Sequence, residues 1–286
     1  MTVIVADLGA TNARLAFMKN GRLSDIYQFA CDDFKNPEEL LVSFMRGYAP
    51  DAKFLLAGVP GPVLNGKVCW TNRSWRLNAR VLKAKLKLKE VVLMNDLQVQ
   101  GMALDLLHKQ DFVFLQKNRP SNEPKILVNV GTGLGACYLI NGQVFASEYG
   151  QSVTPQNVSL ETDISGSGFK RSVQRLKHTK EPVSAVQVAN DYVQGSVIAQ
   201  AAYKDFYAAL ARTLMNLALT IKATGGVYFC GGILDENTLK KLKFDQSFRN
   251  HPKMKPLLSQ MPLIFIRKKD FAFLGLKKLV KKYGWS

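Results

Sequence analysis

The stretch TVIVADLGATNARLAFMKNG, residues 2–21, places two short apolar runs on either side of a polar turn. Residues 2–6 and 13–18 are typical of buried β-strands, and the connection between them offers carboxylate, hydroxyl and amide groups at the tip of a hairpin. We expect Gly9 to supply the positive φ that a tight turn needs. Such a turn can hold a phosphate group through backbone N–H groups while Asp7 faces its metal ion, although an ordinary hairpin has the same pattern.

The same pattern occurs a second time in the middle of the chain. Residues 126–130 predict a strand, GTGLG at 131–135 a turn, and residues 136–140 a second strand. In both copies an Asn-Gly pair, a strong hairpin signal, leads into a third strand. These segments are Asn20-Gly21 before 22–30 and Asn141-Gly142 before 143–147. An internal repeat of this kind predicts two related α/β halves.

The rest of the chain alternates apolar runs with helical patterns, as in other α/β proteins. Further strands are predicted at 53–59, 67–70, 91–94, 227–230 and 263–266. Helices are predicted at 36–46, 78–88, 95–107, 166–176, 184–194 and 196–223, with a basic C-terminal helix from about residue 270. Residues 109–125 are polar and contain Pro, which favours a connection between domains.

The composition argues against several classes of protein. No apolar run approaches the roughly 18 residues of a membrane helix, and the N-terminus lacks the pattern of a secretory signal. The four cysteines are isolated in sequence, which favours free thiols in a reducing cytoplasm over disulfides or a zinc site. The 39 basic and 22 acidic residues give a net charge of +17, but the basic residues follow predicted helix faces without aromatic residues between them. We therefore expect no specific nucleic-acid partner and no membrane association.

Several motifs together resemble one protein family. DLGATN (7–12), GTGLG (131–135) and GVYFCGGI (226–233) are similar to the two-part nucleotide site of the actin, hexokinase and sugar-kinase superfamily. The resemblance is closer to the bacterial glucokinases, whose other motifs follow in order over nearly the whole chain. These segments are AGVPGPV at 57–63, TNRSW at 71–75, LMNDLQVQGMAL at 93–104, SEYGQSVTPQ at 147–156 and ETDISGSG at 161–168.

The resemblance implies an α/β fold of two actin- or ribonuclease-H-like domains with a nucleotide and sugar cleft between them. The small domain would be residues 1–108 plus 270–286, and the large domain residues 109–269. The implied activity is that of an ATP-dependent glucokinase, which phosphorylates the 6-hydroxyl of glucose and gives glucose 6-phosphate and ADP. The cofactors would be ATP and Mg²⁺, and the location the cytoplasm. Chains of this family often form homodimers, although no sequence pattern here identifies an interface.

Two opposed glycine turns can grip a triphosphate through N–H groups, and phosphoryl transfer needs mainly such positioning and charge neutralisation. The resemblance gives Asp7 the role of holding Mg²⁺, with capping of the hairpin turn as the alternative. The residues implied in nucleotide binding are Ala6, Asp7, Leu8, Gly9, Ala10, Thr11, Asn12, Gly131, Thr132, Gly133, Gly231 and Gly232.

The Asn95-Asp96 pair follows a predicted buried strand, where α/β sheets place ligands. A sugar hydroxyl needs a proton acceptor aligned with the phosphate, and the resemblance makes Asp96 that general base. Asn or Asp before a helix is also an ordinary N-cap, so one of the two can cap while the other acts. The residues implied in sugar binding are Asn72, Asn95, Asp96, Glu148, Gln151 and Glu161.

The chain departs from the family pattern at positions in the site. Ala10 stands where related chains have a second glycine, and Tyr149-Gly150-Gln151 stands where they have Gly-Gly-His. Gln can replace one hydrogen-bond donor of His but cannot become a cation. A kinase for another hexose or for an amino sugar is therefore one alternative. A sugar-binding regulator without catalysis is another, and Asp96 together with both phosphate turns argues against it.

Overall fold

The computed structural model describes residues 1–118, 121–122 and 124–285. Residues 119, 120 and 123 of the expected domain connection, and Ser286 at the end of the predicted small domain, lie outside the described residues. None of the helices in the described part of the chain is long and apolar enough to cross a membrane.

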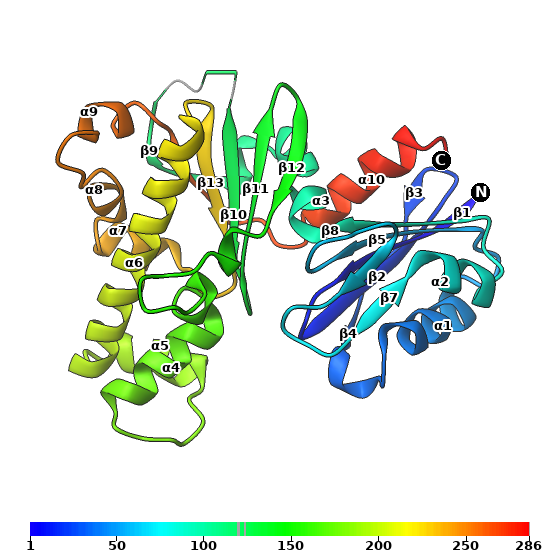
Figure 1. The fold of residues 1–286 in the computed structure, drawn as a ribbon, viewed down its shortest axis with the longest axis horizontal. Helices are drawn as coiled ribbons and strands as arrows, with labels where there is room; N and C mark the ends of the chain where they lie inside the picture. Colours follow the sequence, from blue (N-terminus) through cyan, green and yellow to red (C-terminus); the bar gives the residue numbers. More distant parts are fainter. Residues whose placement is uncertain (119–120, 123, 286) are drawn as a thin grey trace. The chain divides into compact units, whose positions relative to one another are not determined.

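The chain folds into two compact units: unit 1 contains Met1–Leu107 and Lys269–Ser286, and unit 2 contains His108–Lys268. Each unit is built around its own six-stranded sheet (Figure 1). The sheet of unit 1 consists of β1 (Thr2–Leu8), β2 (Asn12–Lys19), β3 (Arg22–Leu23), β4 (Tyr27–Ala30), β5 (Phe54–Val59) and β8 (Glu90–Asn95). A separate hairpin is formed by β6 (Lys67–Cys69) and β7 (Arg76–Asn78). The helices of unit 1 are η1 (Cys31–Asp33), α1 (Pro37–Tyr48), α2 (Ala79–Lys85), α3 (Asp96–Ala103), η2 (Leu104–Leu106) and α10 (Ala272–Lys282).

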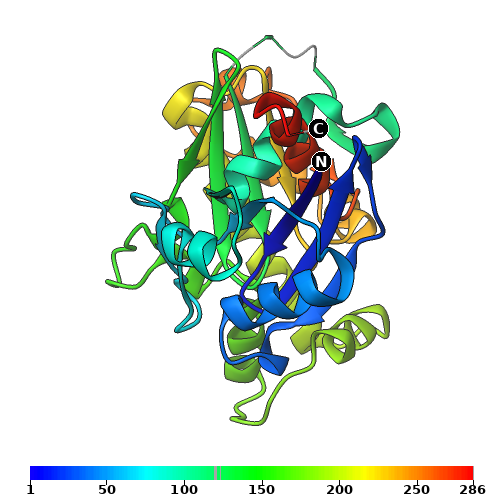
Figure 2. The same cartoon turned by 90° about the vertical axis from the view of Figure 1, so that its right-hand side faces the viewer.

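Alternate side chains of β1 explain the two helical layers of unit 1. Val3 and Val5 lie in a buried cluster with residues of α3 and α10, whereas Ile4 and Ala6 lie in a second cluster with residues of α1 and α2. Figure 2 shows α1 in blue and α10 in red on opposite sides of the strands. A strand that is covered on both faces needs a continuous apolar run, and residues 2–6 supply one.

Unit 2 has the strand order β12-β11-β10-β13-β14-β9. Its strands are β9 (Phe112–Gln116), β10 (Lys125–Val130), β11 (Leu134–Ile140), β12 (Gln143–Ser147), β13 (Gly226–Cys230) and β14 (Leu263–Ile266). Its α-helices are α4 (Gly166–Leu176), α5 (Ala185–Val193), α6 (Val197–Ile221), α7 (Glu236–Lys241), α8 (Phe244–Phe248) and α9 (Lys255–Leu258). Three short 3₁₀ helices are η3 (Lys109–Asp111), η4 (Tyr149–Gln151) and η5 (Leu160–Thr162).

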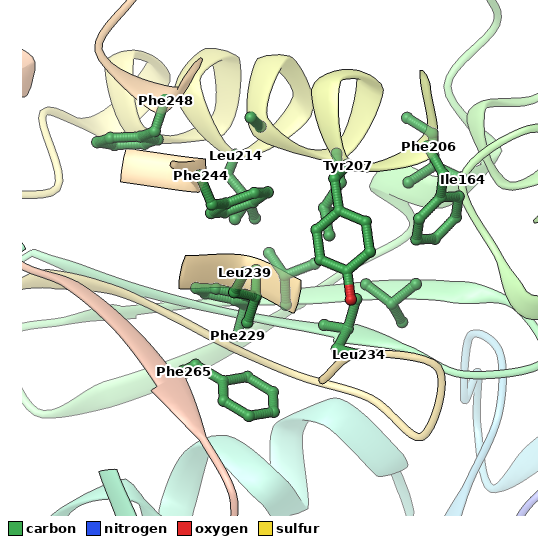
Figure 3. Packing of buried hydrophobic residues seen from close by; sticks show 14 of the residues in the cluster. Ile164, Phe206, Tyr207, Leu214, Phe229, Leu234, Leu239, Phe244, Phe248 and Phe265 are labelled. Carbon is green, nitrogen blue, oxygen red and sulfur yellow. The ribbon is translucent and has the colours of Figure 1, made fainter. Parts of the chain in front are cut away.

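Aromatic side chains join α6 to the sheet of unit 2 (Figure 3). The ring of Phe244 on α8 lies 6.0 Å from that of Tyr207 on α6 and 5.3 Å from that of Phe229 on β13, measured between centroids. The Tyr207 hydroxyl accepts the backbone N–H of Asp235 at 3.1 Å, so this buried oxygen has a partner. The same bond fastens the chain that follows β13 to the core.

The repeated hairpin expected from the sequence is present in both sheets. The first strand of each copy is antiparallel to the second and parallel to a later strand, β5 for β1 and β13 for β10. Both residues of each Asn-Gly turn have positive φ, 51° and 73° at Asn20 and Gly21, and 50° and 71° at Asn141 and Gly142. Two-residue hairpin turns of type I′ require this conformation. The prediction of two related α/β halves is confirmed.

The single strand predicted at 22–30 is wrong, because this segment forms two short strands, β3 and β4, which both pair with β2. Between them the Ser24 hydroxyl accepts the Phe17 N–H at 3.0 Å. A side-chain hydrogen bond of this kind takes the place of a bond between strands and interrupts the ladder.

The connection predicted at 109–125 is also wrong, because it contains the strand β9. This strand pairs antiparallel with β14, with Val113 opposite Phe265. Polar residues precede and follow its five residues, FVFLQ, so the composition of the whole segment obscures a short strand.

Gly9 does not have the positive φ expected from the sequence. The pairing of β1 with β2 continues to Leu8 and Ala13, and the Gly9 N–H donates to the Asn12 carbonyl at 3.0 Å. A Cβ atom at Gly9 would lie 2.7 Å from that same carbonyl oxygen. Glycine is therefore required by lack of space rather than by backbone conformation.

Gly275→Ala is expected to destabilise the protein by about 2–3 kcal/mol, the upper part of the range for overpacking. A Cβ at Gly275 on α10 would lie 2.0 Å from the Val99 carbonyl oxygen on α3. The matched control is Gly47→Ala in α1, where a Cβ meets no atom within 4 Å, and where we expect up to about 1 kcal/mol of stabilisation. Urea unfolding measures both changes, and an unchanged midpoint for Gly275→Ala would contradict the tight crossing of α3 and α10.

Candidate active site

Three parallel strands of unit 1 end side by side at one edge of its sheet. Asp7 near the end of β1 pairs with Gly58 of β5, and Val59 at the end of β5 pairs with Asn95 at the end of β8. Ligands of α/β sheets bind beyond the carboxyl ends of the strands. This edge therefore gathers the predicted phosphate turn, Asp7 and the Asn95-Asp96 pair.

Within the first predicted phosphate turn, residues 7–12, the segment 9–11 is held by hydrogen bonds from Cys31. The Gly9 carbonyl accepts the Cys31 thiol at 3.5 Å, and the Thr11 carbonyl accepts the Cys31 N–H at 2.9 Å. Ala10, between them, packs against the buried cluster that contains Cys31. The turn thus rests on the core of unit 1.

Asp7 has only 15% of its side chain exposed and shares a cation with a second carboxylate. Arg14 Nη1 lies 3.8 Å from Asp7 Oδ2, and Arg14 Nε lies 2.9 Å from Asp270 Oδ1. Burial raises the pKa of Asp7 to about 6, with the Arg14 charge opposing the rise and the Asp270 charge adding to it. Two carboxylates facing one guanidinium leave an excess negative charge, which favours a bound cation.

Asn95 and Asp96 make different contacts at the start of α3. Asn95 is the buried N-cap of α3: its Oδ1 accepts the Gln98 N–H at 3.1 Å, and its Nδ2 donates to the Gly61 carbonyl at 3.3 Å. The capping alternative therefore applies to Asn95. Asp96 is half-buried as the first residue of α3, and its Oδ1 accepts the Leu97 N–H at 2.8 Å.

The predicted sugar loop with Asn72 connects β6 to β7. At its base the backbone N–H of Trp70 donates to the Trp75 carbonyl at 2.9 Å, and the two buried rings meet edge to face with centroids 6.0 Å apart. Asn72 itself is exposed. Arg73 donates to the Ala10 carbonyl at 3.4 Å, so the loop lies beside the phosphate turn.

The two predicted nucleotide turns of unit 2 also lie side by side. β13 runs parallel to β10, and each turn follows one of these strands. A Cβ at Gly231 would lie 2.1 Å from the Val130 carbonyl oxygen, so the turn after β13 passes against the end of β10. The Gly131 N–H donates to the Gly133 carbonyl at 2.9 Å, and the Gly131 carbonyl accepts the Gly166 N–H at 2.8 Å.

The predicted sugar residues of unit 2 lie close to its first glycine turn. Glu161 Oε2 accepts the Leu134 N–H at 3.4 Å, directly after that turn. Burial raises the pKa of Glu148, and the nearby charge of Glu161 adds to the rise. Gln151 is exposed and donates its backbone N–H to the Glu148 carbonyl at 2.9 Å. Carboxylates and an amide in this arrangement can hydrogen-bond adjacent hydroxyl groups of a sugar.

The donor set fits a metal ion that is held mainly by phosphate and water. In the described residues, no group of three or more His, Cys, Asp or Glu side chains could hold a metal ion. Mg²⁺ usually keeps several waters and takes one or two protein carboxylates together with substrate phosphates. Asp7 has a carboxylate of this kind beside the predicted phosphate turn.

The structure places the predicted residues in two groups, one in each unit. In unit 1 the turn with Asp7, the Asn95-Asp96 pair and the loop with Asn72 are neighbours. In unit 2 the two glycine turns lie near Glu148, Gln151 and Glu161. Ala6 and Leu8 are fully buried in β1, so a nucleotide could contact only their backbone.

Three side chains of unit 1 belong to the candidate site although the sequence did not single them out. Arg14 follows the first phosphate motif, and Arg73 lies within TNRSW, so their place in these motifs was a usable signal. Asp270 is far from Arg14 in the sequence, and the fold brings the two side chains into contact. No local pattern identifies that contact.

Two sheets with the same hairpin, each carrying glycine turns at the carboxyl ends of parallel strands, define a protein of the actin-like ATPase fold. The chain belongs to the glucokinase family, whose sequence model matches residues 4–152 and 146–283. It is 27% identical to the glucokinase of Colwellia psychrerythraea, with 95% of this chain and 94% of the relative covered. It is 26% identical to that of Nitrobacter hamburgensis, with 96% of both chains covered.

Solved structures show the same fold. A glucokinase from an Antarctic psychrotroph superimposes with a TM-score of 0.77 at 23% identity, over 98% of this chain and 99% of that one. A ROK-family glucokinase from Streptomyces griseus, in complex with glucose and AMPPNP, gives a TM-score of 0.75 at 15% identity, over 99% and 100% of the two chains. A ROK-family transcriptional regulator gives 0.73 at 17% identity, over 98% and 78%.

Asp7→Asn is expected to stabilise the ligand-free protein at pH 8 and to leave it unchanged near pH 4. Below pH 3.8 the carboxyl is protonated in both folded and unfolded chains, whereas above about pH 6 folding must bury its charge. Each unit of pKa shift corresponds to about 1.4 kcal/mol, so the gain at pH 8 is up to about 3 kcal/mol. Urea unfolding of variant and wild type at both pH values measures it.

The control for this experiment is Asp51→Asn, where the sign is opposite. Hydrogen bonds from Lys19 and Thr2 lower the pKa of the exposed Asp51, so this carboxylate favours folding above its unfolded pKa and loses that effect as the pH falls. Asp51→Asn should therefore not stabilise the protein at pH 8. Equal effects of the two substitutions would show that burial of Asp7 is not the cause.

Proposed function

We propose that the protein is an ATP-dependent hexose kinase, with glucose as the favoured substrate, and that it forms glucose 6-phosphate and ADP. The observation that carries the proposal is the pair of structurally repeated glycine turns, each at the carboxyl end of parallel strands. Membership of the glucokinase family supports it. We further propose that residues 1–108 with 270–286 act as the small catalytic domain and residues 109–269 as the large one.

In this proposal the glycine turns hold the phosphates through backbone N–H groups. Asp7 would hold Mg²⁺, which supplies neutralisation of the phosphate charge when bound. The raised pKa of Asp7 means that its carboxylate is less fully ionised below about pH 6, so nucleotide affinity should fall there. Thr11 and Thr132 would add hydroxyl donors at the two turns.

Asp96 would accept the proton of the sugar hydroxyl as it attacks the terminal phosphate. The carboxylate works by position, since its Oδ1 is already fixed by the Leu97 N–H. Asn72, Glu148 and Glu161 would orient the sugar by hydrogen bonds to its other hydroxyls. The side-chain amide of Asn95 uses its oxygen and its nitrogen in hydrogen bonds to the protein backbone. Asn95 would therefore act on the sugar mainly by fixing Asp96 at the start of α3.

An assay of ADP release across hexoses and amino sugars tests the proposed function. We expect turnover with glucose above the ATP-only background. Turnover confined to another hexose or an amino sugar would move the proposal to that substrate, an alternative that Gln151 favours because it replaces the histidine of the family pattern. Hexose binding without turnover would favour a sugar-binding regulator.

Asp96→Asn is expected to lower kcat by about 10²-fold or more, the effect of losing a positioned base. An amide cannot take up the hydroxyl proton, but its oxygen can still accept the Leu97 N–H, so the melting temperature and ATP affinity should stay nearly constant. Asp25→Asn, at an exposed position of unit 1, is the matched control and should retain wild-type turnover. If Asp96→Asn keeps most of the turnover, Asp96 is not the general base and serves only at the start of α3.

Gln151→His is expected to raise kcat/KM for glucose relative to other hexoses by up to about tenfold. Gln151 is exposed on η4 and its backbone is bonded to Glu148, so a new side chain can be accommodated beside the proposed sugar residues. Steady-state kinetics on the same sugars provide the comparison. An unchanged order of preference would show that residue 151 does not contact the substrate.

A further inference from the structure

Arg73 makes four contacts that reach from the sugar loop to the phosphate turn of unit 1. Its Nη1 donates to the Ala10 carbonyl at 3.4 Å and to Asp32 Oδ1 at 2.7 Å. Its Nη2 donates to the Cys31 carbonyl at 3.0 Å. The guanidinium carbon lies 4.3 Å from the centroid of the Trp75 ring, a cation–π contact.

With the Arg73 contact, each of the three carbonyl groups of residues 9–11 in the phosphate turn accepts a hydrogen bond. The carbonyls of Gly9 and Thr11 accept hydrogen bonds from Cys31, and that of Ala10 accepts one from Arg73. In a planar trans peptide the N–H points away from the preceding carbonyl. Fixing these three carbonyls on one side therefore aims the N–H groups of residues 10–12 to the other side, as an anion site needs.

The guanidinium is suited to this role because of its shape. Arginine presents five N–H donors in one plane, so a single group can serve two backbone carbonyls and a carboxylate together, whereas a lysine ammonium is a compact point charge. The ion pair with Asp32 contributes little by itself, since Asp32 is 88% exposed and exposed pairs are weak. The structural role of Arg73 therefore lies in its two hydrogen bonds to backbone carbonyls.

Arg73 also adjoins Asn72, the residue of this loop that the proposed function assigns to the sugar. The loop has a closed base, formed by Trp70 and Trp75, and the Arg73 guanidinium lies over the Trp75 ring. A change in the position of the loop must therefore move the guanidinium or break its bond to Ala10. The loop and the turn are mechanically linked through one side chain.

We infer that Arg73 is a positioning residue that holds the phosphate turn from the sugar loop, so that sugar bound at the loop and nucleotide bound at the turn strengthen each other's binding. The second half of this inference rests on the proposed function, whereas the first half concerns the ligand-free protein. Arg73 touches neither substrate in this scheme and acts through Ala10 and Asn72.

Hydrogen exchange of the ligand-free protein tests the first half. In Arg73→Met and Arg73→Lys, the amides of Gly9 and Cys31, which donate to the Asn12 and Thr11 carbonyls, should exchange at least about tenfold faster than in wild type, because the turn opens locally. Arg76→Met, an exposed arginine of the same hairpin, and Asp32→Asn are controls that should leave exchange unchanged. Wild-type exchange in both Arg73 variants would overturn the inference. Wild-type exchange in Arg73→Lys alone would show that charge rather than the planar fork holds the turn and would overturn that part.

Calorimetric binding of glucose and of a non-hydrolysable ATP analogue tests the second half. Saturating glucose should tighten binding of the analogue at least about fivefold in wild type and less than about twofold in Arg73→Met, while glucose affinity without nucleotide changes less than about threefold. Equal tightening in both proteins would overturn the coupling. If wild type binds neither ligand, the proposed function and the coupling fail together, and hydrogen exchange still decides whether Arg73 holds the turn.

Discussion

Parallel pairing of β1 with β5 and of β10 with β13 determines where the proposed site residues of each unit lie. An antiparallel hairpin alone would place a single turn at its tip. A parallel neighbour ends at the same edge as the first strand, so its own following residues join that turn. In unit 1 the sequence continues from β8 into Asp96, and in unit 2 it continues from β13 into Gly231. The meeting of residues from distant segments therefore depends on the direction of three strand pairs, because β8 reaches the same edge through its own parallel pairing with β5.

Local signals in the sequence predict the parts of this arrangement that depend on a few neighbouring residues. The Asn20-Gly21 turn is an example, because both residues need positive φ and few other residue pairs adopt it. The break at Ser24 depends on a side-chain bond to Phe17, which composition does not reveal. The contact of Asp270 with Arg14 depends on the return of the chain to unit 1, so no local pattern contains it.

The predicted role of Asp7 could be stated from its motif, but its electrostatic setting could not. Burial raises the pKa of Asp7 to about 6, and the charge of Asp270 adds to the rise, whereas the shared Arg14 guanidinium opposes it. A carboxylate in that setting opposes folding at neutral pH, and a residue retained for stability alone would not be charged there. The strain between charge and burial is what a bound cation would relieve, so the unfavourable feature supports a binding role.

The space around the backbone explains which residues depart from the family pattern that the sequence analysis describes. A Cβ at Gly150 would lie 1.9 Å from the Leu134 carbonyl oxygen, so glycine is retained at the second position of the Tyr-Gly-Gln segment. Tyr149, where related chains have the first glycine, packs against the core of unit 2, and Ala10 packs against a core cluster of unit 1. Both substitutions thus add side-chain atoms where the core receives them. Gln151 has neither constraint, because its side chain is exposed. A substitution at residue 151 therefore leaves the glycine turns in place, so the proposed contribution of this side chain to sugar preference is separable from the proposed contribution of the turns to nucleotide binding.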